Sequence, residues 1–162
     1  MEYQISTDPT KFDLDLIHKF LSEHSYWARG IPREVVARSI ANSLCFGVYV
    51  VETPTPIPDL RQVGFARVTT DRATFAYLGD VFILPEHRGR GLSKRLMDEI
   101  LAHPDLQGLR RWMLATADAH ELYRKYGFTA LSNPDSFMQR HNPSVYVNGE
   151  RVKGPYKQEN GS

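Results

Sequence analysis

The spacing of apolar and polar positions alternates between helical and strand patterns along the chain. Some segments repeat apolar residues every three or four positions, whereas others are short apolar runs rich in β-branched and aromatic residues. The pattern predicts helices over residues 13–22, 32–43 and 118–126, and one from residue 92 that ends before Pro104. It predicts strands over residues 44–51, 63–70, 74–84, 112–115, 128–131 and 136–140. This alternation indicates an α/β protein.

Polar and proline-rich segments separate these elements. Residues 53–59 read Thr-Pro-Thr-Pro-Ile-Pro-Asp, which predicts an exposed hairpin loop because proline cannot pair within a central strand. The chain becomes polar and glycine-containing from residue 142 onward. A length of 162 residues suits one domain with an adequate core. We therefore expect a single domain over residues 1–141 and a polar tail over residues 142–162.

The balance of charge argues against nucleic acid or a membrane as the partner. The chain has 20 Lys and Arg residues against 19 Asp and Glu residues, so its formal net charge is +1 at pH 7. Positive charge is instead local, at Arg88, Arg90, Lys94, Arg95, Arg110, Arg111, Arg124 and Lys125. A local cluster of this kind fits a small polyanion better than a duplex.

Cysteine usage and hydropathy favour a reducing cytoplasm. Cys45 is the only cysteine, so no intramolecular disulfide can form, and its apolar surroundings predict a buried, inert thiol. No apolar stretch approaches the roughly 20 residues that span a bilayer, and the first residues lack the pattern of a signal peptide. The six His residues and one Cys do not supply the usual zinc-binding sets, so we expect no metal.

Residues 88–93, Arg-Gly-Arg-Gly-Leu-Ser, are the most informative segment and are called the glycine loop below. They follow an apolar run over residues 77–84 and open an amphipathic helix. A helix N-terminus offers unpaired N–H groups and the positive end of the helix dipole, and glycine lets the backbone approach an anion closely. The spacing fits neither a Walker loop nor the dinucleotide fingerprint, which would need a third glycine at Lys94.

The glycine loop resembles the acetyl-CoA signature of the GNAT superfamily of N-acetyltransferases, Arg/Gln-x-x-Gly-x-Gly/Ala. It departs from the pattern at Ser93, where Gly or Ala is usual. A second segment, Ala119 to Phe128, is similar to the superfamily's later motif Ala-x-x-x-Tyr-x-x-x-Gly-Phe, and it follows the expected strand over residues 112–115. The resemblance covers roughly residues 63–131, with both motifs in the right order.

This resemblance implies a fold and a cofactor. The fold would be a mixed, largely antiparallel sheet with helices on both faces, in which the long strand and the following one splay apart. Acetyl-CoA would be the co-substrate, with its pantetheine and acetyl oxygen on the backbone of Val81, Phe82 and Ile83. Its pyrophosphate would lie on Arg88, Gly89, Arg90, Gly91, Leu92, Ser93 and Lys94, and Thr116 stands where many members carry a cofactor-contacting Asn. His87 is expected to flank the phosphates or solvent.

The same resemblance suggests two catalytic residues. Tyr123 matches the family's usual general acid, which protonates the departing sulfur, and the alternative is an aromatic packing residue. Asp80 is the only carboxylate within residues 74–84, and burying it unpaired in an apolar run would be costly. It would orient the amine or relay its proton. The alternative for Asp80 is that it pairs with a nearby Arg or caps a bulge.

The acceptor is the least defined part of the prediction. Tyr26, Trp27 and Arg29 lie in the loop that shapes the acceptor pocket in this fold, although a hydrophobic plug would explain the aromatic residues equally well. Tyr77 is assigned to the acceptor site and, with Glu86, is a lesser candidate for the base. The expected function is acetyl transfer to a primary amine of a small molecule or peptide, in a possible homodimer. The alternative is a non-catalytic CoA-binding sensor or scaffold.

Overall fold

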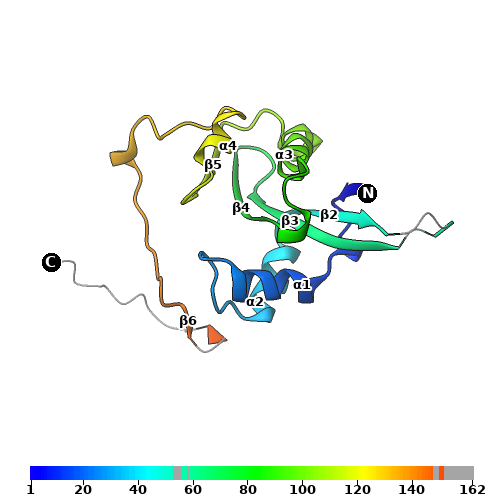
Figure 1. Ribbon diagram of the computed structural model, residues 1–162. Coiled ribbons are helices and arrows are strands. Elements are labelled where there is room, and N and C mark those ends of the chain that lie inside the picture. The colour runs from blue at the N-terminus through cyan, green and yellow to red at the C-terminus, as the bar shows by residue number, and fades with distance from the viewer. Residues whose placement is uncertain (53–55, 58, 148–149, 152–162) are drawn as a thin grey trace. The chain divides into compact units, whose positions relative to one another are not determined.

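The computed structural model describes residues 1–52, 56–57, 59–147 and 150–151 (Figure 1). Most of the proline-rich loop predicted at residues 53–59, and most of the polar tail, lie outside the described residues. The chain divides into two compact units. The first consists of Met1–Asp13 and Arg38–Phe128, and the second of Leu14–Ala37 and Thr129–Ser162. A single domain over residues 1–141 stays a prediction.

The first unit is built on a five-stranded sheet in the order β1-β2-β3-β4-β5 (Figure 1). Its strands are β1 (Glu2–Ser6), β2 (Leu44–Val51), β3 (Leu60–Thr70), β4 (Phe75–Ile83) and β5 (Arg111–Leu114). The pairs from β1 to β4 are antiparallel, and β4 pairs with β5 in parallel. The predicted mixed, largely antiparallel sheet is therefore confirmed. The pattern missed β1, which is a short edge strand with only two apolar inward positions, Tyr3 and Ile5.

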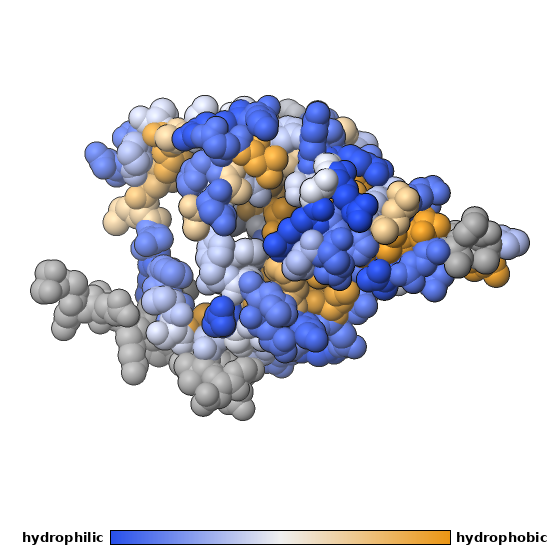
Figure 2. Space-filling model, viewed as in Figure 1, coloured by the Kyte–Doolittle hydropathy of each residue, from blue (hydrophilic) through white to orange (hydrophobic). Residues whose placement is uncertain are grey.

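The core of the first unit lies between the sheet and helix α3 (Leu92–Ala102). Leu92, Leu96, Met97 and Ile100 share one face of α3 at helical spacing and are buried against alternate residues of β2 and its neighbours. The opposite face of α3 carries charged residues, and Figure 2 shows hydrophilic side chains over it. The helix predicted from residue 92 is confirmed and ends before Pro104.

The other helices differ in length from the predicted ones, and α2 and α4 are shorter. Helix α1 (Leu14–Lys19) continues as a π-helical turn, Phe20–His24, so the two together cover the predicted helix over residues 13–22 except its first residue. Helix α2 (Arg33–Ala41) starts directly after Pro32, as expected for proline at a helix start. Helix α4 (His120–Arg124) is a little more than one turn long.

The strands predicted over residues 128–131 and 136–140 are wrong. No strand forms there in the described structure, and a 3-10 turn, Pro134–Ser136, interrupts the segment. The cause is local, since Asn-Pro-Asp at residues 133–135 favours a turn and proline lacks the N–H that a sheet needs. A short hairpin forms later in the second unit, between β6 (Tyr146–Val147) and β7 (Glu150–Arg151).

Strand β2 contains a glycine whose missing side chain makes room for an aromatic ring. The ring of Tyr49 folds over Gly47, and its Cζ would lie 2.6 Å from a Cβ at that position. Tyr49 is 2% exposed, and its hydroxyl has no hydrogen-bond partner among the described residues. Burial also raises the pKa of this phenol above its ordinary value, because the charged form would lose its hydration.

We predict that Gly47→Ala lowers the free energy of unfolding by on the order of 2 kcal/mol, because the new methyl group collides with the Tyr49 ring. Gly79→Ala is the matched control, since a Cβ there would lie 3.8 Å from Tyr77, an ordinary contact. Both changes reduce the flexibility of the unfolded chain equally. Denaturant unfolding of the two variants measures the difference, and equal stabilities would show that the ring moves aside at no cost.

Candidate active site

Strands β4 and β5 pair over only part of their length. The parallel register runs from Phe75↔Arg111 to Leu78↔Leu114, and β4 then continues to Ile83 with no strand beside it on that edge among the described residues. This point is called the strand fork below. The predicted splay of the two strands stays a prediction, because β5 itself ends at Leu114. Val81, Phe82 and Ile83 lie on the part of β4 beyond the fork, where β5 no longer accompanies the strand.

A β-bulge lies directly after the fork. The register passes from Arg67↔Gly79 to Phe65↔Phe82, so one residue of β3 opposes two residues of β4, Asp80 and Val81. Asp80 has a φ of 53°, in the left-handed region that Asp tolerates better than most residues. Bulges bend a strand and increase its twist. The bend therefore occurs where β5 stops accompanying β4.

The carboxylate of Asp80 is held by an arginine on the neighbouring strand. Nε of Arg67 lies 2.7 Å from Oδ2 of Asp80, and the two side chains are 24% and 10% exposed. Arg67 also donates from Nη1 to the hydroxyls of Ser43 (3.2 Å) and Thr69 (3.0 Å). Both features that the sequence left open for Asp80, an Arg partner and a bulge, are present. The pairing supplies a partner to a carboxylate that would be costly to bury alone.

Cys45 lies close enough to this ion pair to feel both of its charges, but burial dominates its chemistry. The thiol is buried, and burial raises its pKa to about 12, while Arg67 acts to lower the pKa and Asp80 to raise it. A thiol with so high a pKa stays protonated near pH 7 and is a poor nucleophile. The predicted buried location of Cys45 is confirmed.

The glycine loop connects β4 to α3 through a 3-10 turn, Pro85–His87. Gly89 and Gly91 have φ values of 74° and 72°, so both occupy the left-handed region. A Cβ at either position would meet nothing within 4 Å, which means that the loop is open on this side. The first turn of α3 has no acidic residue and no side-chain cap. Its N–H groups are therefore suited to an anion.

The basic residues of the loop are not committed to carboxylates. No ion pair among the described residues uses Arg88, Arg90 or Lys94. Nε of Arg88 donates to the carbonyl of Ile83 at 2.9 Å, which ties this side chain to the end of β4. Arg90 and Lys94 are exposed. The loop thus combines open backbone with positive charge that no nearby acid balances.

Tyr123 is buried rather than exposed at the surface of α4. Its side chain is 8% exposed, and its ring packs edge-on against Phe128 with centroids 6.0 Å apart. Its carbonyl accepts from the N–H groups of Tyr126 and Phe128 at the end of the helix. The hydroxyl of Thr116 accepts from the N–H of Ala119 at 3.0 Å, so this side chain helps to start α4.

The structure divides the predicted acceptor residues between the two units. Tyr77 is 39% exposed and lies on β4 together with Asp80. Tyr26 and Trp27, 58% and 43% exposed, form an edge-on pair with centroids 5.0 Å apart in the second unit. Arg29 is exposed in the same loop. The exposure of the two aromatic residues argues against a buried hydrophobic plug within that unit.

His87 is buried, so of its two expected positions the one next to solvent is wrong, and the one beside the phosphates stays a prediction. It is 4% exposed, and its Nδ1 lies 2.9 Å from the hydroxyl of Tyr3 on β1. Its Nε2 has no partner among the described residues. Nothing in the sequence pairs these residues, since Tyr3 belongs to the strand that the hydrophobic pattern missed.

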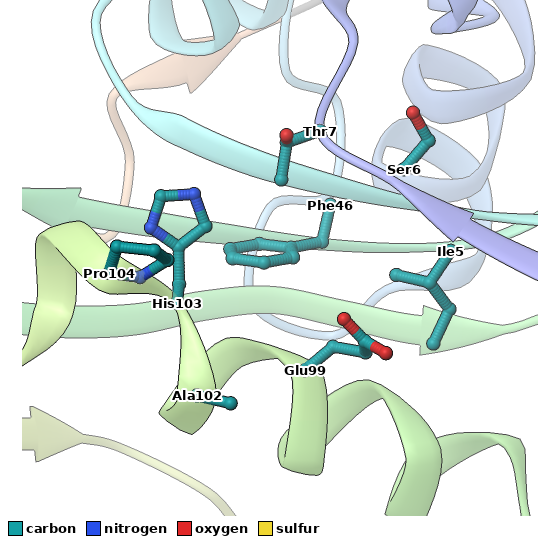
Figure 3. A pocket seen from close by; sticks show the side chains of 8 residues that line it. All are labelled: Ile5, Ser6, Thr7, Phe46, Glu99, Ala102, His103 and Pro104. Atoms are coloured by element: carbon teal, nitrogen blue, oxygen red, sulfur yellow. The ribbon is translucent and has the colours of Figure 1, made fainter.

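A cavity of about 200 Å³ lies at the other end of α3 from the glycine loop. Figure 3 shows Ile5, Ser6 and Thr7 on one side and Glu99, Ala102 and His103 on the other, with Phe46 between them. None of the predicted site residues lines it. Elsewhere in the described ranges, no three His, Cys, Asp or Glu side chains come together as a metal site would need. No helix of the described part combines the length and apolar character needed to cross a bilayer.

Comparisons with known proteins agree with this geometry. A profile of the Acetyltransferase (GNAT) domain matches residues 46–130, which include the strand fork, the glycine loop and Tyr123. A protein of Gibberella zeae whose name places it among the acetyltransferases is 37% identical over 138 residues, 76% of this chain and 77% of that protein. A crystal structure from Xanthomonas campestris pv. campestris, assigned to the GNAT family, is 56% identical with a TM-score of 0.83, covering 90% of this chain and 97% of that chain.

A more distant structure supports the fold alone. The N-acetylglutamate synthase of Neisseria gonorrhoeae, solved with coenzyme A and N-acetylglutamate, is 17% identical with a TM-score of 0.58. The match covers 82% of this chain and 30% of that chain. The fold and the site therefore define an enzyme of the acetyl-transferring class. Within that class, the chain belongs to the GNAT family of N-acetyltransferases.

Proposed function

We propose that the protein transfers the acetyl group of acetyl-CoA to a primary amine of a small molecule or peptide, by direct attack in a ternary complex. The observation that carries this proposal is the strand fork followed at once by the open glycine loop. Beyond the fork β5 no longer accompanies β4, which is where an extended pantetheine chain would lie, and the loop offers N–H groups to a pyrophosphate. The coenzyme A bound to the Neisseria gonorrhoeae structure supports the same assignment.

The reaction asks the protein to position two substrates and to manage charge. The amine nitrogen attacks the thioester carbonyl carbon, the C–S bond breaks as the tetrahedral adduct collapses, and the nitrogen loses a proton. Backbone groups of Val81, Phe82 and Ile83 hold the pantetheine and the acetyl oxygen. Holding both reactants together supplies a large part of the rate, and donors to the developing oxyanion supply more.

Asp80 is the proposed base or proton relay. The amine is mostly protonated near pH 7 and must lose a proton before it attacks. Arg67 fixes the direction of the Asp80 carboxylate, which suits a group that orients an ammonium or accepts its proton through water. The bulge places this carboxylate directly beyond the fork, on the same strand as the backbone that holds the acetyl group.

Tyr123 is the proposed acid that protonates the departing sulfur. A phenol with a pKa near 10 must give its proton to a thiolate with a pKa near 8.5, so transfer is uphill unless it accompanies collapse of the adduct. The packing of Tyr123 against Phe128 fixes its ring and supports a defined hydroxyl position. Thr116, at the start of the same helix, contributes to the cofactor site.

The remaining assignments concern the acceptor-binding residues, the co-substrate, the cellular compartment and the oligomeric state. Tyr26, Trp27 and Arg29 of the second unit, and separately Tyr77 of the first, are the proposed acceptor-binding residues, because exposed aromatic side chains offer an apolar surface and Arg29 offers a hydrogen-bond donor. Acetyl-CoA enters as co-substrate without a metal. The enzyme acts in the cytoplasm, and a homodimer is its proposed assembly.

We predict that Arg90→Ala weakens coenzyme A binding about tenfold, or ~1.4 kcal/mol, because one charge-assisted contact to the pyrophosphate is lost. Arg110→Ala, which removes an equal charge from an exposed site outside the loop, leaves the affinity unchanged. Calorimetric titration with coenzyme A measures both. Equal affinities for the two variants would place the pyrophosphate elsewhere.

We predict that Tyr123→Phe lowers kcat by about 100-fold or more and leaves the Kd for coenzyme A within twofold, because only proton transfer to the sulfur is lost. Thiol release from acetyl-CoA against a panel of primary amines measures kcat. Tyr126→Phe, whose hydroxyl donates to the carbonyl of Lys94, is the matched control and keeps its kcat. An unchanged kcat in Tyr123→Phe would leave Tyr123 with a packing role, and thiol release by neither protein would favour a CoA-binding sensor.

We predict that Asp80→Asn lowers kcat/KM for the amine by about 100-fold and changes its pH profile, because Asn tolerates the left-handed backbone but accepts no proton. Glu52→Gln, which breaks the exposed pair between Glu52 and Arg61, is the control for loss of an ion pair. Initial rates from pH 6 to 9 measure both profiles. A lower stability of Asp80→Asn with an unshifted pH profile would make the Arg67–Asp80 pair purely structural.

A further inference from the structure

We propose that Tyr3 and His87 together position the glycine loop, with Tyr3 clamping the loop from both ends. The inference rests on the proposed binding of coenzyme A by this loop. It adds a positioning pair that lies outside both sequence motifs. Tyr3 belongs to the edge strand β1, and His87 is the last residue of the turn that leads into Arg88.

The first contact reaches the loop from its N-terminal end. His87 is 4% exposed although Glu86 and Arg88 on either side are exposed, so the turn buries this one side chain. Its Nδ1 lies 2.9 Å from the hydroxyl of Tyr3, and the two rings meet edge-on with centroids 5.8 Å apart. The turn is thereby fixed to a strand that lies three strands away from β4 in the sheet.

The second contact reaches the loop from its C-terminal end. Nη2 of Arg95, in the first turn of α3, donates to the carbonyl of Tyr3 at 3.1 Å. Tyr3 itself is held by β2, where it pairs with Val50. One residue of the sheet edge therefore bonds to the residue before the loop and to a residue just after it. The segment between His87 and Arg95 spans every residue assigned to the pyrophosphate.

The loop needs such an anchor because it has little support of its own. Gly89 and Gly91 touch nothing where their side chains would be, and glycine has the largest conformational freedom in the unbound state. A loop that is already held in the binding geometry loses less entropy when the ligand binds. The Tyr3 clamp supplies this preorganisation from outside the motif.

Of the two ring nitrogens of His87, Nδ1 is the one that contacts Tyr3. The single proton of the Tyr3 hydroxyl has two acceptors in reach, because the sulfur of Met1 lies 3.2 Å from the same oxygen. When the hydroxyl donates to the sulfur, Nδ1 of His87 carries the proton and donates to Tyr3. Nε2 is buried without a partner among the described residues in either case, which costs stability. Nδ1 is therefore the imidazole nitrogen through which His87 holds the loop.

Two substitutions at position 87 separate the two nitrogen atoms. An Asn side-chain amide can occupy the place of Nδ1, and a Gln side-chain amide reaches the place of Nε2. We expect His87→Gln and Tyr3→Phe each to raise the Kd for coenzyme A and the KM for acetyl-CoA five- to tenfold, with kcat within twofold. The variant His87→Asn, in contrast, keeps the Kd for coenzyme A and the KM for acetyl-CoA within twofold of the parent protein. The double variant Tyr3→Phe, His87→Gln is no worse than either single variant, because both break one bond.

Tyr49→Phe is the matched control, since it removes a buried hydroxyl from the same sheet away from the loop, and its KM stays unchanged. Calorimetry with coenzyme A and steady-state kinetics give the values, and Tyr3→Phe keeps the test usable should His87→Gln fail to fold. The proposal is overturned by an unchanged Kd in Tyr3→Phe, by additive effects, or by rescue with Gln instead of Asn. Failure of the parent protein to bind coenzyme A would instead overturn the proposed function.

Discussion

The parallel pairing of β4 with β5 is the constraint on which the site depends. Two parallel neighbours need a crossover, here made by α3, and a crossover helix begins near the carboxyl end of the first strand. The N-terminus of α3 is therefore brought close to the end of β4, with the glycine loop as the shortest route between them. Because β5 pairs only as far as Leu114, the end of β4 has β3 but not β5 as its neighbour. One connection therefore brings together the start of α3 and the part of β4 that β5 does not accompany.

Asp80, His87 and Tyr49 are three polar residues of the first unit whose side chains are buried or nearly so, which carries an energetic cost. Asp80 recovers that cost through Arg67, which itself bonds to two hydroxyls and so fixes the direction of the carboxylate. One ring nitrogen of His87 contacts the hydroxyl of Tyr3, whereas the hydroxyl of Tyr49 has no hydrogen-bond partner among the described residues. Two of the three, Asp80 and His87, lie beyond the strand fork, on β4 and on the turn that follows it. Buried polar groups that reduce stability are expected at functional sites, and these two lie beside the residues proposed to bind coenzyme A.

The sequence predicts the long elements and the backbone of the site well. The β2, β3 and β4 strands, α3 and the glycine loop follow from apolar spacing and local turn chemistry, which act over a few residues. The two motifs identify the family, and the comparisons confirm it. Strand β1 escapes the pattern because an edge strand of five residues with two apolar positions has too little signal.

What the sequence does not give are contacts between distant segments. The partner of Asp80 was left open because Arg67 lies on another strand, and only the bulged register brings the two side chains together. The burial of His87 is missed for the same reason, since its neighbours along the chain are exposed and its partner is Tyr3. The strands wrongly predicted near Pro134 have a different cause. Their apolar residues suggest strands, but the local turn residues form a 3-10 turn there instead. Tertiary pairing, rather than composition, determines these features.

The single, deeply buried thiol makes this enzyme convenient for spectroscopy. Cys45 is the only cysteine in the chain, and its pKa of about 12 leaves almost no thiolate at the pH used for labelling. A cysteine introduced at an exposed position would therefore take up a maleimide dye or spin label selectively, with the native residue left in place. Pairs of such labels would report distances within the folded enzyme and between its two compact units, which is a route to their arrangement in solution.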